Sequence, residues 1–194
     1  MNTADDTYHA GMRRLQDRYD TRRLADRLDE RLGRNAFTAE DRTFIESRPL
    51  FFLATADAQG RPDCSYKGGA PGFVRVTGDD EVAFPSYDGN GMFRSLGNLL
   101  VNEAVGLLFI DFESPRRLRV NGRATIADDD PLQAEFPGAQ QVVRVRAGRI
   151  FPNFPRYIHR SAGAELSPYA PREGYSPPEP KWKSMPMLAD VLPR

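Results

Sequence analysis

Apolar residues in the first 48 positions recur at the three- and four-residue spacing of an α-helix. The helical stripe consists of Tyr8, Met12, Leu15 and Tyr19, and continues with Leu24, Leu28 and Leu32. Gly33 then gives a helix-stop signal. A second, shorter helix is expected to begin at Thr38, because Thr38 and Asp41 have the spacing of a capping box. Pro49 ends that helix, since proline moves the residue before it out of helical geometry.

From Leu50 onward the pattern changes to short apolar or alternating runs separated by turn residues, which is typical of β-strands. The predicted strands span residues 50–56, 61–67, 73–77, 81–87, 105–112, 116–126 and 142–150. Helical turns are expected over 92–101 and over 131–136, where Asp130 resembles an N-cap and Pro131 a first helical residue. A meander of short strands tends to close into a barrel. The predicted fold class is therefore mainly β with flanking helices.

The length of 194 residues predicts one barrel domain with appended arms. Residues 1–48 form the helical segment, residues 49–160 the barrel, and residues 161–194 a proline-rich arm that docks on another surface. The 27 basic and 27 acidic residues cancel, which argues against a nucleic-acid-binding barrel. No apolar run reaches the length of a membrane span, and residues 1–8 lack the pattern of a signal peptide. We expect a cytoplasmic protein that binds neither membrane nor nucleic acid.

Metal-dependent and hydrolytic chemistry are not indicated. The chain has two histidines, His9 and His159, with no metal-binding motif and no nucleophile elbow. Its single cysteine, Cys64, excludes a disulfide framework and is expected to be a small buried hydrophobe within a strand. No metal ligand and no catalytic residue are assigned, and Tyr66, Tyr87 and His159 are only candidates for an acid or base.

Three segments carry groups that favour an anionic ligand. Residues 86–95 run from a strand end through a glycine-rich turn to a helix start, where free amides, Arg94 and Ser95 can hold phosphate. Lys67 ends a strand and precedes paired glycines, which let the backbone pass close to a flat ligand or another strand. Arg117 and Arg119 share one face of a strand. The structural alternatives are a glycine turn with an exposed arginine, a strand-end lysine before a flexible loop, and the solvated exterior of a barrel.

Taken in order, these segments resemble the FMN-binding split-barrel superfamily related to pyridoxamine 5'-phosphate oxidase, and in particular its predicted flavin-nucleotide-binding proteins. The resemblance covers residues 50–150, with a weaker likeness beyond. It is carried by SYKGGAPGFV at 65–74, GNGMFRSLGN at 89–98, NEAVGLLF at 102–109, LRVNGRA at 118–124 and FPNFPRYI at 151–158. It implies a six-stranded antiparallel split β-barrel that forms a homodimer, with one FMN in each of two clefts between the subunits.

The resemblance also implies where the cofactor lies. Lys67, Arg94 and Ser95 would hold the FMN phosphate, and Trp182 of the arm would cover the ring or the partner subunit. The ring would lie beside the strand end 85–87 and near Arg117 or Arg119. The full set of implied cofactor-binding residues is Ser65, Tyr66, Lys67, Pro85, Ser86, Tyr87, Asn90, Arg94, Ser95, Asn98, Arg117, Arg119 and Trp182.

Two functions follow from the resemblance. The first is an FMN-dependent oxidoreductase that acts on a small substrate or another redox cofactor, with an arginine near the ring stabilising the reduced flavin. The second is a non-catalytic FMN-binding carrier or redox sensor. Deazaflavin or haem in the same cleft is the alternative to FMN. The arm lacks the tryptophan- and arginine-bearing stretch that grips pyridoxal phosphate in the true oxidase, so we do not expect that oxidase activity.

Overall fold

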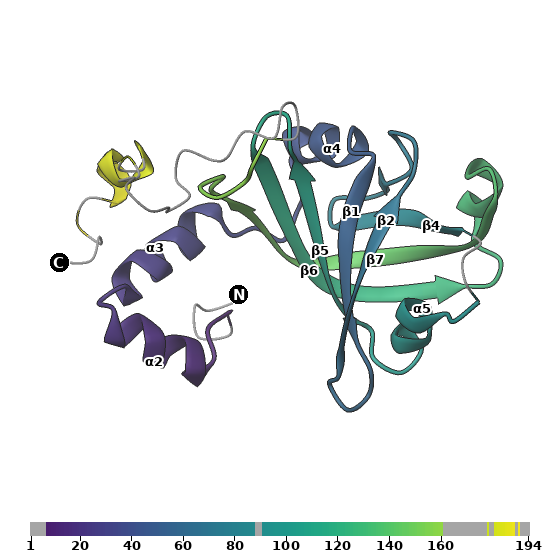
Figure 1. Cartoon of the computed structure of the whole chain (residues 1–194), viewed down its shortest axis with the longest axis horizontal. Coiled ribbons are helices and arrows are strands. Elements are labelled where there is room, and N and C mark those ends of the chain that lie inside the picture. Colours follow the sequence, from purple (N-terminus) through teal and green to yellow (C-terminus); the bar gives the residue numbers. More distant parts are fainter. Residues whose placement is uncertain (1–6, 88–90, 161–177, 179–180, 189, 191–194) are drawn as a thin grey trace. The chain divides into compact units, whose positions relative to one another are not determined.

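The computed structural model describes residues 7–87, 91–160, 178, 181–188 and 190. Its contacts group the chain into two compact units, Met1–Gly33 with Arg156–Arg194, and Arg34–Pro155. Figure 1 shows the helices of the first unit and the sheet of the second. The predicted boundaries at residues 48 and 160 stay predictions, and the contacts assign the helix that follows Thr38 to the unit that contains the sheet.

The first unit contains the predicted N-terminal helices and part of the arm. Its described elements are α2 (Ala10–Arg18), α3 (Arg22–Leu32) and the 3-10 helices η2 (Lys181–Ser184) and η3 (Pro186–Leu188). Tyr8 donates its hydroxyl to the carbonyl oxygen of Ala25 at 3.0 Å, and Arg27 donates to the carbonyl oxygen of Met187 at 2.7 Å. These bonds tie the start of the unit and the end of the arm to α3. None of the helices in the described part of the chain combines the length and apolar content that crossing a bilayer requires.

In the second unit, α4 (Ala39–Glu46) begins where the sequence predicts. The Thr38 hydroxyl accepts a hydrogen bond from the Asp41 amide at 3.1 Å, and the Asp41 carboxylate accepts one from the Thr38 amide at 3.0 Å. Both halves of the predicted capping box are therefore present. The buried Asp41 carboxylate also pairs with Arg34 at 2.8 Å. The helix ends before Pro49, and its Ile45 is fully buried in the core of the sheet.

The described sheet has seven antiparallel strands. They are β1 (Leu50–Ala56), β2 (Pro62–Gly68), β3 (Arg75–Val76), β4 (Glu81–Tyr87), β5 (Ala104–Asp111), β6 (Arg116–Ala127) and β7 (Ala139–Asn153), in the order β2-β1-β5-β6-β7-β4-β3. The predicted antiparallel, mainly β fold with flanking helices is confirmed. The six strands implied by the resemblance are corrected to seven, in agreement with the seven runs predicted from the pattern, because the two residues of β3 pair with β4 as a separate short strand. Phe73 and Val74, which we predicted to be part of that strand, precede β3 and are buried in the core.

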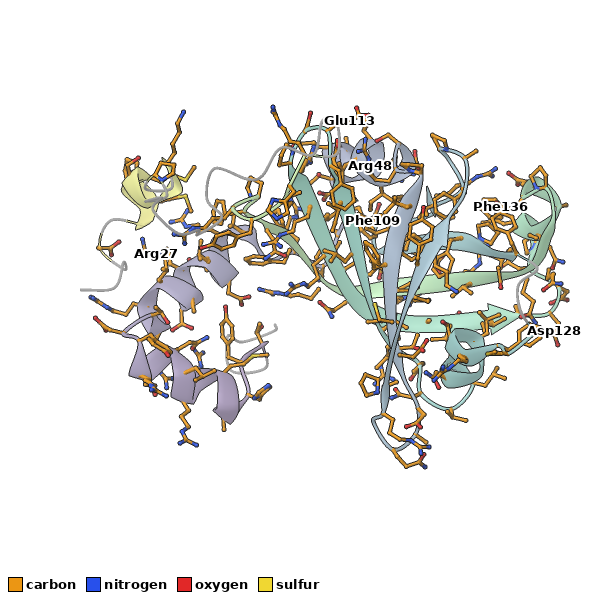
Figure 2. The ribbon with its side chains drawn as sticks, in the orientation of Figure 1. Arg27, Arg48, Phe109, Glu113, Asp128 and Phe136 are labelled. Atoms are coloured by element: carbon orange, nitrogen blue, oxygen red, sulfur yellow. The ribbon has the colours of Figure 1, made fainter. Side chains whose placement is uncertain are left out.

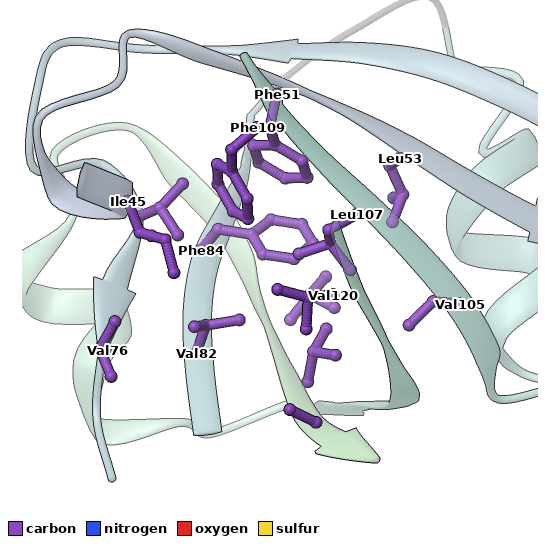
Figure 3. Close-up of a cluster of buried hydrophobic side chains, with 14 of the residues drawn as sticks. Ile45, Phe51, Leu53, Val76, Val82, Phe84, Val105, Leu107, Phe109 and Val120 are labelled. Carbon is purple, nitrogen blue, oxygen red and sulfur yellow. The ribbon is translucent and has the colours of Figure 1, made fainter. Parts of the chain in front are cut away.

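The side chains of β6 alternate as predicted. Leu118 and Val120 are buried, whereas Arg119 is exposed and Arg117 is half-buried on the opposite face. The buried face belongs to a cluster around Phe51, whose ring centroid lies 4.9 Å from that of Phe84 (Figure 3). This apolar interior sets which side of each neighbouring strand faces inward.

The turn between β5 and β6 is held by an ion pair at the end of the sheet that carries α4. Arg48 pairs with Asp111 at 2.6 Å, and the Asp111 carboxylate also accepts from the amides of Glu113 at 2.9 Å and Ser114 at 3.1 Å. Arg48 and Glu113 lie near each other at this end in Figure 2. These hydrogen bonds lower the pKa of Asp111 against the opposing effect of its burial.

Gly122 marks a close approach of β6 and β7. The register between these strands shifts between Asn121 and Gly122, and a Cβ atom at Gly122 would lie 2.1 Å from the carbonyl oxygen of Arg146. Glycine is needed here because any side chain would push the two backbones apart.

Candidate functional site

Strand β2 places three polar side chains on its inner side. Asp63, Ser65 and Lys67 pair with residues of β1 whose side chains are buried, and successive residues of a strand point to opposite faces. Cys64 and Tyr66 therefore lie on the outer side, and both are exposed. The expectation of a buried Cys64 is wrong, because the polar residues of this edge strand take the inward positions.

A cavity of about 240 Å³ lies between β2, the end of β4 and α5 (Arg94–Leu99). Helix α5 packs against β1 and β2, and Figure 1 labels it within the sheet-bearing part of the chain. The described lining residues are Asp63, Ser65, Lys67, Ser86, Tyr87, Gly91, Phe93, Arg94, Ser95 and Leu96. The structure thus brings together the lysine of one predicted anion-binding segment and the arginine of another.

A short polar network crosses the cavity wall. The hydroxyl oxygens of Ser65 and Ser95 are 3.0 Å apart, and the Ser95 hydroxyl donates to the Asp63 carboxylate at 3.3 Å. The Arg94 Nε atom lies 3.8 Å from the Asp63 carboxylate, at the outer limit of an ion pair. Because the Arg94 side chain is 74% exposed, this pair is loose and leaves the guanidinium able to contact a ligand.

Lys67 is half-buried in the cavity wall. Burial lowers the pKa of its ammonium group, and the nearby Asp63 carboxylate partly offsets that effect. A second negative charge beside the ammonium would stabilise its protonated form further. An anionic ligand and this lysine would therefore favour each other.

The start of α5 differs from the prediction. We predicted a helix over 92–101, but α5 has six residues and no side-chain cap. Phe93 adopts a left-handed conformation with φ 49°, and Gly91 has φ 71°, so the chain cannot be helical before Arg94. The predicted contribution of helix amides to anion binding is not supported by so short a helix. The groups available to bind an anion are therefore the polar side chains of the lining.

Several predicted residues lie outside the cavity lining. Pro85 is buried, and Asn98 donates to the hydroxyl of Thr55 at 3.0 Å. Arg117 donates to the carbonyl oxygen of Phe154 at 3.1 Å, and Arg119 is exposed on the outer face of β6. Desolvation, with the nearby Arg119, lowers the pKa of Arg117. Asn90 and the side chain of Trp182 are outside the described residues.

The paired glycines leave room for two aromatic rings of the same chain. A Cβ atom at Gly68 would lie 2.7 Å from the ring of Tyr66, and one at Gly69 would lie 2.6 Å from the ring of Phe73. We predicted a close approach to a flat ligand or another strand. In the structure the flat groups are these two rings, and Tyr66 also packs edge-on against Phe52 with centroids 6.0 Å apart.

Sequence reasoning missed the acidic member of the lining. Asp63 precedes Ser65 and Lys67 at the two-residue spacing that places strand residues on one face, so the signal was available. The prediction rested on positive charge alone and therefore did not include Asp63. Gly91, Phe93 and Leu96 were also not assigned. Across the described residues, no three His, Cys, Asp or Glu side chains gather in a way that could hold a metal ion.

A family model described as pyridoxamine 5'-phosphate oxidase matches residues 37–162. No curated protein matches the sequence. The solved structures that match include HupZ from Group A Streptococcus, with 23% identity over 60% of this chain and 93% of that chain at a TM-score of 0.48.

Two further solved structures carry different printed descriptions. HutZ from Vibrio cholerae, described as a heme storage protein, is 22% identical over 59% of this chain and 94% of that chain, at a TM-score of 0.44. An FMN-binding protein from Syntrophomonas wolfei is 13% identical over 74% of this chain and 95% of that chain, at a TM-score of 0.43. Likenesses at these values carry no conclusion about what this chain binds.

Proposed function

This chain belongs to the pyridoxamine 5'-phosphate oxidase family, and from that premise we propose that its cavity holds the phosphate of FMN in an oxidoreductase that acts on a small substrate or another redox cofactor. The observation that carries the proposal is the convergence of Lys67 and Arg94 on one cavity that also presents two serine hydroxyls. The residues come from two segments far apart in the sequence. A cytoplasmic location remains part of this proposal.

The lining fits a phosphate group by charge and by donor type. Lys67 and Arg94 supply two positive charges, and the Ser65 and Ser95 hydroxyls supply neutral hydrogen bonds. Charge-assisted hydrogen bonds of this kind contribute roughly 1.5–3 kcal/mol each. With Asp63 included, the charged side chains of the described lining carry a net charge of one positive unit. The site therefore favours an anion.

The size of the cavity indicates which part of FMN it encloses. Sites that enclose a whole small-molecule ligand usually measure about 300–1,000 Å³, and this cavity measures about 240 Å³. It accommodates the phosphate and part of the ribityl chain. The flavin ring then lies beyond the lining and needs a second surface to exclude water.

We propose that a second copy of this chain provides that surface. A row of outer-face residues crosses four strands in register: Tyr66 pairs with Phe52, Phe52 with Leu108, and Leu108 with Arg119. Tyr66 is 60% exposed, and Phe52 and Leu108 are half-buried. Three of these four residues are apolar or aromatic, and covering such surface is favourable.

Light scattering tests the homodimer directly, and the expected mass is that of two chains. Leu108→Arg should yield a monomer that retains its fold, because the new charge would be desolvated in the interface. Thr125→Arg, at an exposed position of β6 outside the row, should remain dimeric. A monomeric wild-type protein at micromolar concentration would contradict the homodimer.

When bound, FMN supplies hydride transfer at its ring. Lys67 and Arg94 bind the phosphate and thereby orient the cofactor, and Ser65 and Ser95 add hydrogen bonds to the same group. Phe93 and Leu96 contribute apolar surface to the cavity wall, which limits the access of water. Tyr87 lines the cavity and is 38% exposed, so its hydroxyl can reach a ligand that enters from solvent.

A non-catalytic carrier or redox sensor is the second candidate function. The titratable side chains of the described lining are Asp63, Lys67, Arg94 and Tyr87, and all but Tyr87 carry charges that act on an anion. His159 and Tyr66, our other candidates for an acid or base, are not part of this lining. A site equipped mainly to hold an anion favours storage or transport over proton transfer.

The experiment is to purify the protein and identify the copurifying ligand by its visible spectrum and mass. FMN is expected, and haem or deazaflavin would overturn the cofactor assignment. Oxidation of NADH or NADPH by the loaded protein faster than by free FMN, or acceptance of an amine or quinone, supports the oxidoreductase. Turnover no faster than that of free FMN, with no such substrate accepted, favours the carrier.

A further inference from the structure

The cavity that holds the two cations also contains a carboxylate that a simple phosphate site does not need. Asp63 lies on the same strand face as Ser65 and Lys67, and its side chain is only 21% exposed. It accepts a hydrogen bond from Ser95 and lies 3.8 Å from Arg94. Its contacts are therefore with the groups that a bound phosphate would use.

We infer that Asp63 is a specificity-determining residue, which competes with the ligand phosphate for Arg94 and Ser95 and so weakens binding in proportion to the charge on that phosphate. This inference rests on the proposed function of the cavity. In the free protein Asp63 contacts both donors, Ser95 at 3.3 Å and Arg94 at 3.8 Å. When a phosphate enters, its oxygens and the carboxylate lie close together, and like charges repel. The affinity for the most highly charged phosphate is reduced most.

Three flavins test this relation, because they share one ring system and differ at the end of the ribityl chain. Riboflavin carries no phosphate, the ribityl phosphate of FAD is a diester with one negative charge, and the FMN phosphate is a monoester with nearly two at neutral pH. Coulomb energy is proportional to charge and falls with distance, and the second phosphate of FAD, which also carries one negative charge, lies farther from Asp63. If removal of the Asp63 charge tightens FMN about tenfold, it should tighten FAD by a smaller factor and leave riboflavin unchanged.

The test compares the dissociation constants of the three flavins for the full-length wild-type chain and Asp63→Asn. Asparagine has nearly the same shape and keeps an oxygen that can accept the Ser95 hydrogen bond, so the variant removes charge and little else. Asp80→Asn is the matched control, since Asp80 lies 3.8 Å from the Nε atom of Arg146 and does not line the cavity. Asp63→Ser provides a second uncharged variant if Asp63→Asn unfolds at a lower temperature than the wild type.

The graded gain for FMN over FAD over riboflavin, absent in Asp80→Asn, is the expected result. Equal gains for all three flavins would overturn the inference, as would an unchanged or weaker FMN affinity in both Asp63 variants. Inorganic phosphate separates this inference from the flavin proposal. If no flavin binds either protein but phosphate binds Asp63→Asn more tightly, the role of Asp63 stands and the flavin proposal fails. If phosphate binds the wild type and Asp63→Asn equally tightly, the inference about Asp63 is wrong regardless of the flavin results.

Discussion

Two arginine–aspartate pairs in the Arg34–Pro155 unit differ in how fully the protein itself uses their charges. Arg144 donates to both carboxylate oxygens of Asp130, one at 2.9 Å, and to Glu81 at 2.7 Å. The Asp130 side chain is only 3% exposed, and its carboxylate also accepts from the amide of Leu132. Arg94, by contrast, is 74% exposed and makes one long contact with Asp63. Arg144 is thus compensated by two carboxylates of the protein, whereas Arg94 lines a cavity with its side chain mostly exposed.

The difference separates a structural ion pair from a candidate binding site. Hydrogen bonds from Arg144 lower the pKa of Asp130, and hydrogen bonds to Asp130 and Glu81 raise the pKa of Arg144. Each charge is thus stabilised by its partner. At the cavity, burial lowers the pKa of Lys67, which means that the protein does not fully compensate that charge. An incompletely compensated cation beside a cavity is where an anionic ligand adds stability.

Arg144→Met should give the largest effect and should act on stability. The substitution leaves the buried Asp130 carboxylate without its arginine, and breaking such a pair costs about 3 kcal/mol. Urea unfolding followed by circular dichroism measures the loss. Arg146→Met, on the same strand with a 74% exposed side chain, should cost less than about 1 kcal/mol. Equal losses in the two variants would remove the structural role that we assign to the Arg144 cluster.

The stability difference between wild type and Arg144→Met should also depend on pH. Because the pKa of Asp130 is lowered in the folded protein, its contribution is present above the unfolded-state pKa and disappears as pH falls through the folded-state value. The gap should therefore narrow below about pH 4. A gap of constant size down to about pH 2 would contradict the assignment of the effect to Asp130.

Arg94→Ala should show the opposite behaviour, with affinity lost and stability kept. Removing a charge-assisted phosphate contact should weaken FMN binding at least about tenfold, since about 1.4 kcal/mol is a factor of ten. The melting temperature of the free protein should not change, because the side chain is mostly exposed. Arg146→Ala is a close control, with the same exposure and the same 3.8 Å distance to a carboxylate. Retention of FMN by Arg94→Ala equal to that of the control would reject the phosphate site.

The smallest expected effect is a pH dependence of FMN binding that comes from Lys67. Its ordinary pKa of 10.5 is lowered by burial, so its positive charge is lost at a lower pH than that of an exposed lysine. FMN affinity should fall as pH rises through the lowered pKa of Lys67, and the fall should begin at a lower pH than an exposed lysine would give. Lys67→Arg should retain its affinity, because arginine stays protonated. Titrations with riboflavin over the same pH range measure the contribution of the ring, which is subtracted. If FMN affinity declined with pH as much in Lys67→Arg as in the wild type, Lys67 would be excluded as the cause.

Local signals in the sequence predicted the elements of the fold well. The capping box of Thr38 and Asp41 and the alternation along β6 depend on neighbouring residues, so they can be read without a structure. The length of α5 could not be read in this way. The apolar pattern over 92–101 resembles that of a helix. The left-handed conformation of Phe93, however, prevents helical geometry before Arg94.

Six predicted residues line the described part of the cavity, namely Ser65, Lys67, Ser86, Tyr87, Arg94 and Ser95. Its acidic residue, Asp63, was missed because its charge is opposite to the one we sought. Cys64 was expected to be buried, but the burial of a residue in an edge strand depends on which face other elements cover. The pairing of β2 with β1 and the position of α5 make that choice.

The sequence by itself determined the residue types, the strand alternation and the two basic segments that a phosphate site requires, because these depend on the order of residues alone. Tertiary structure decided that Lys67 and Arg94 share one cavity and that Asp63 lies in its lining, 3.8 Å from Arg94. It also decided that the charge of Arg144 is compensated by Asp130 and Glu81. Electrostatic interactions depend on distance and burial in space. Those quantities exist only once the strands are paired.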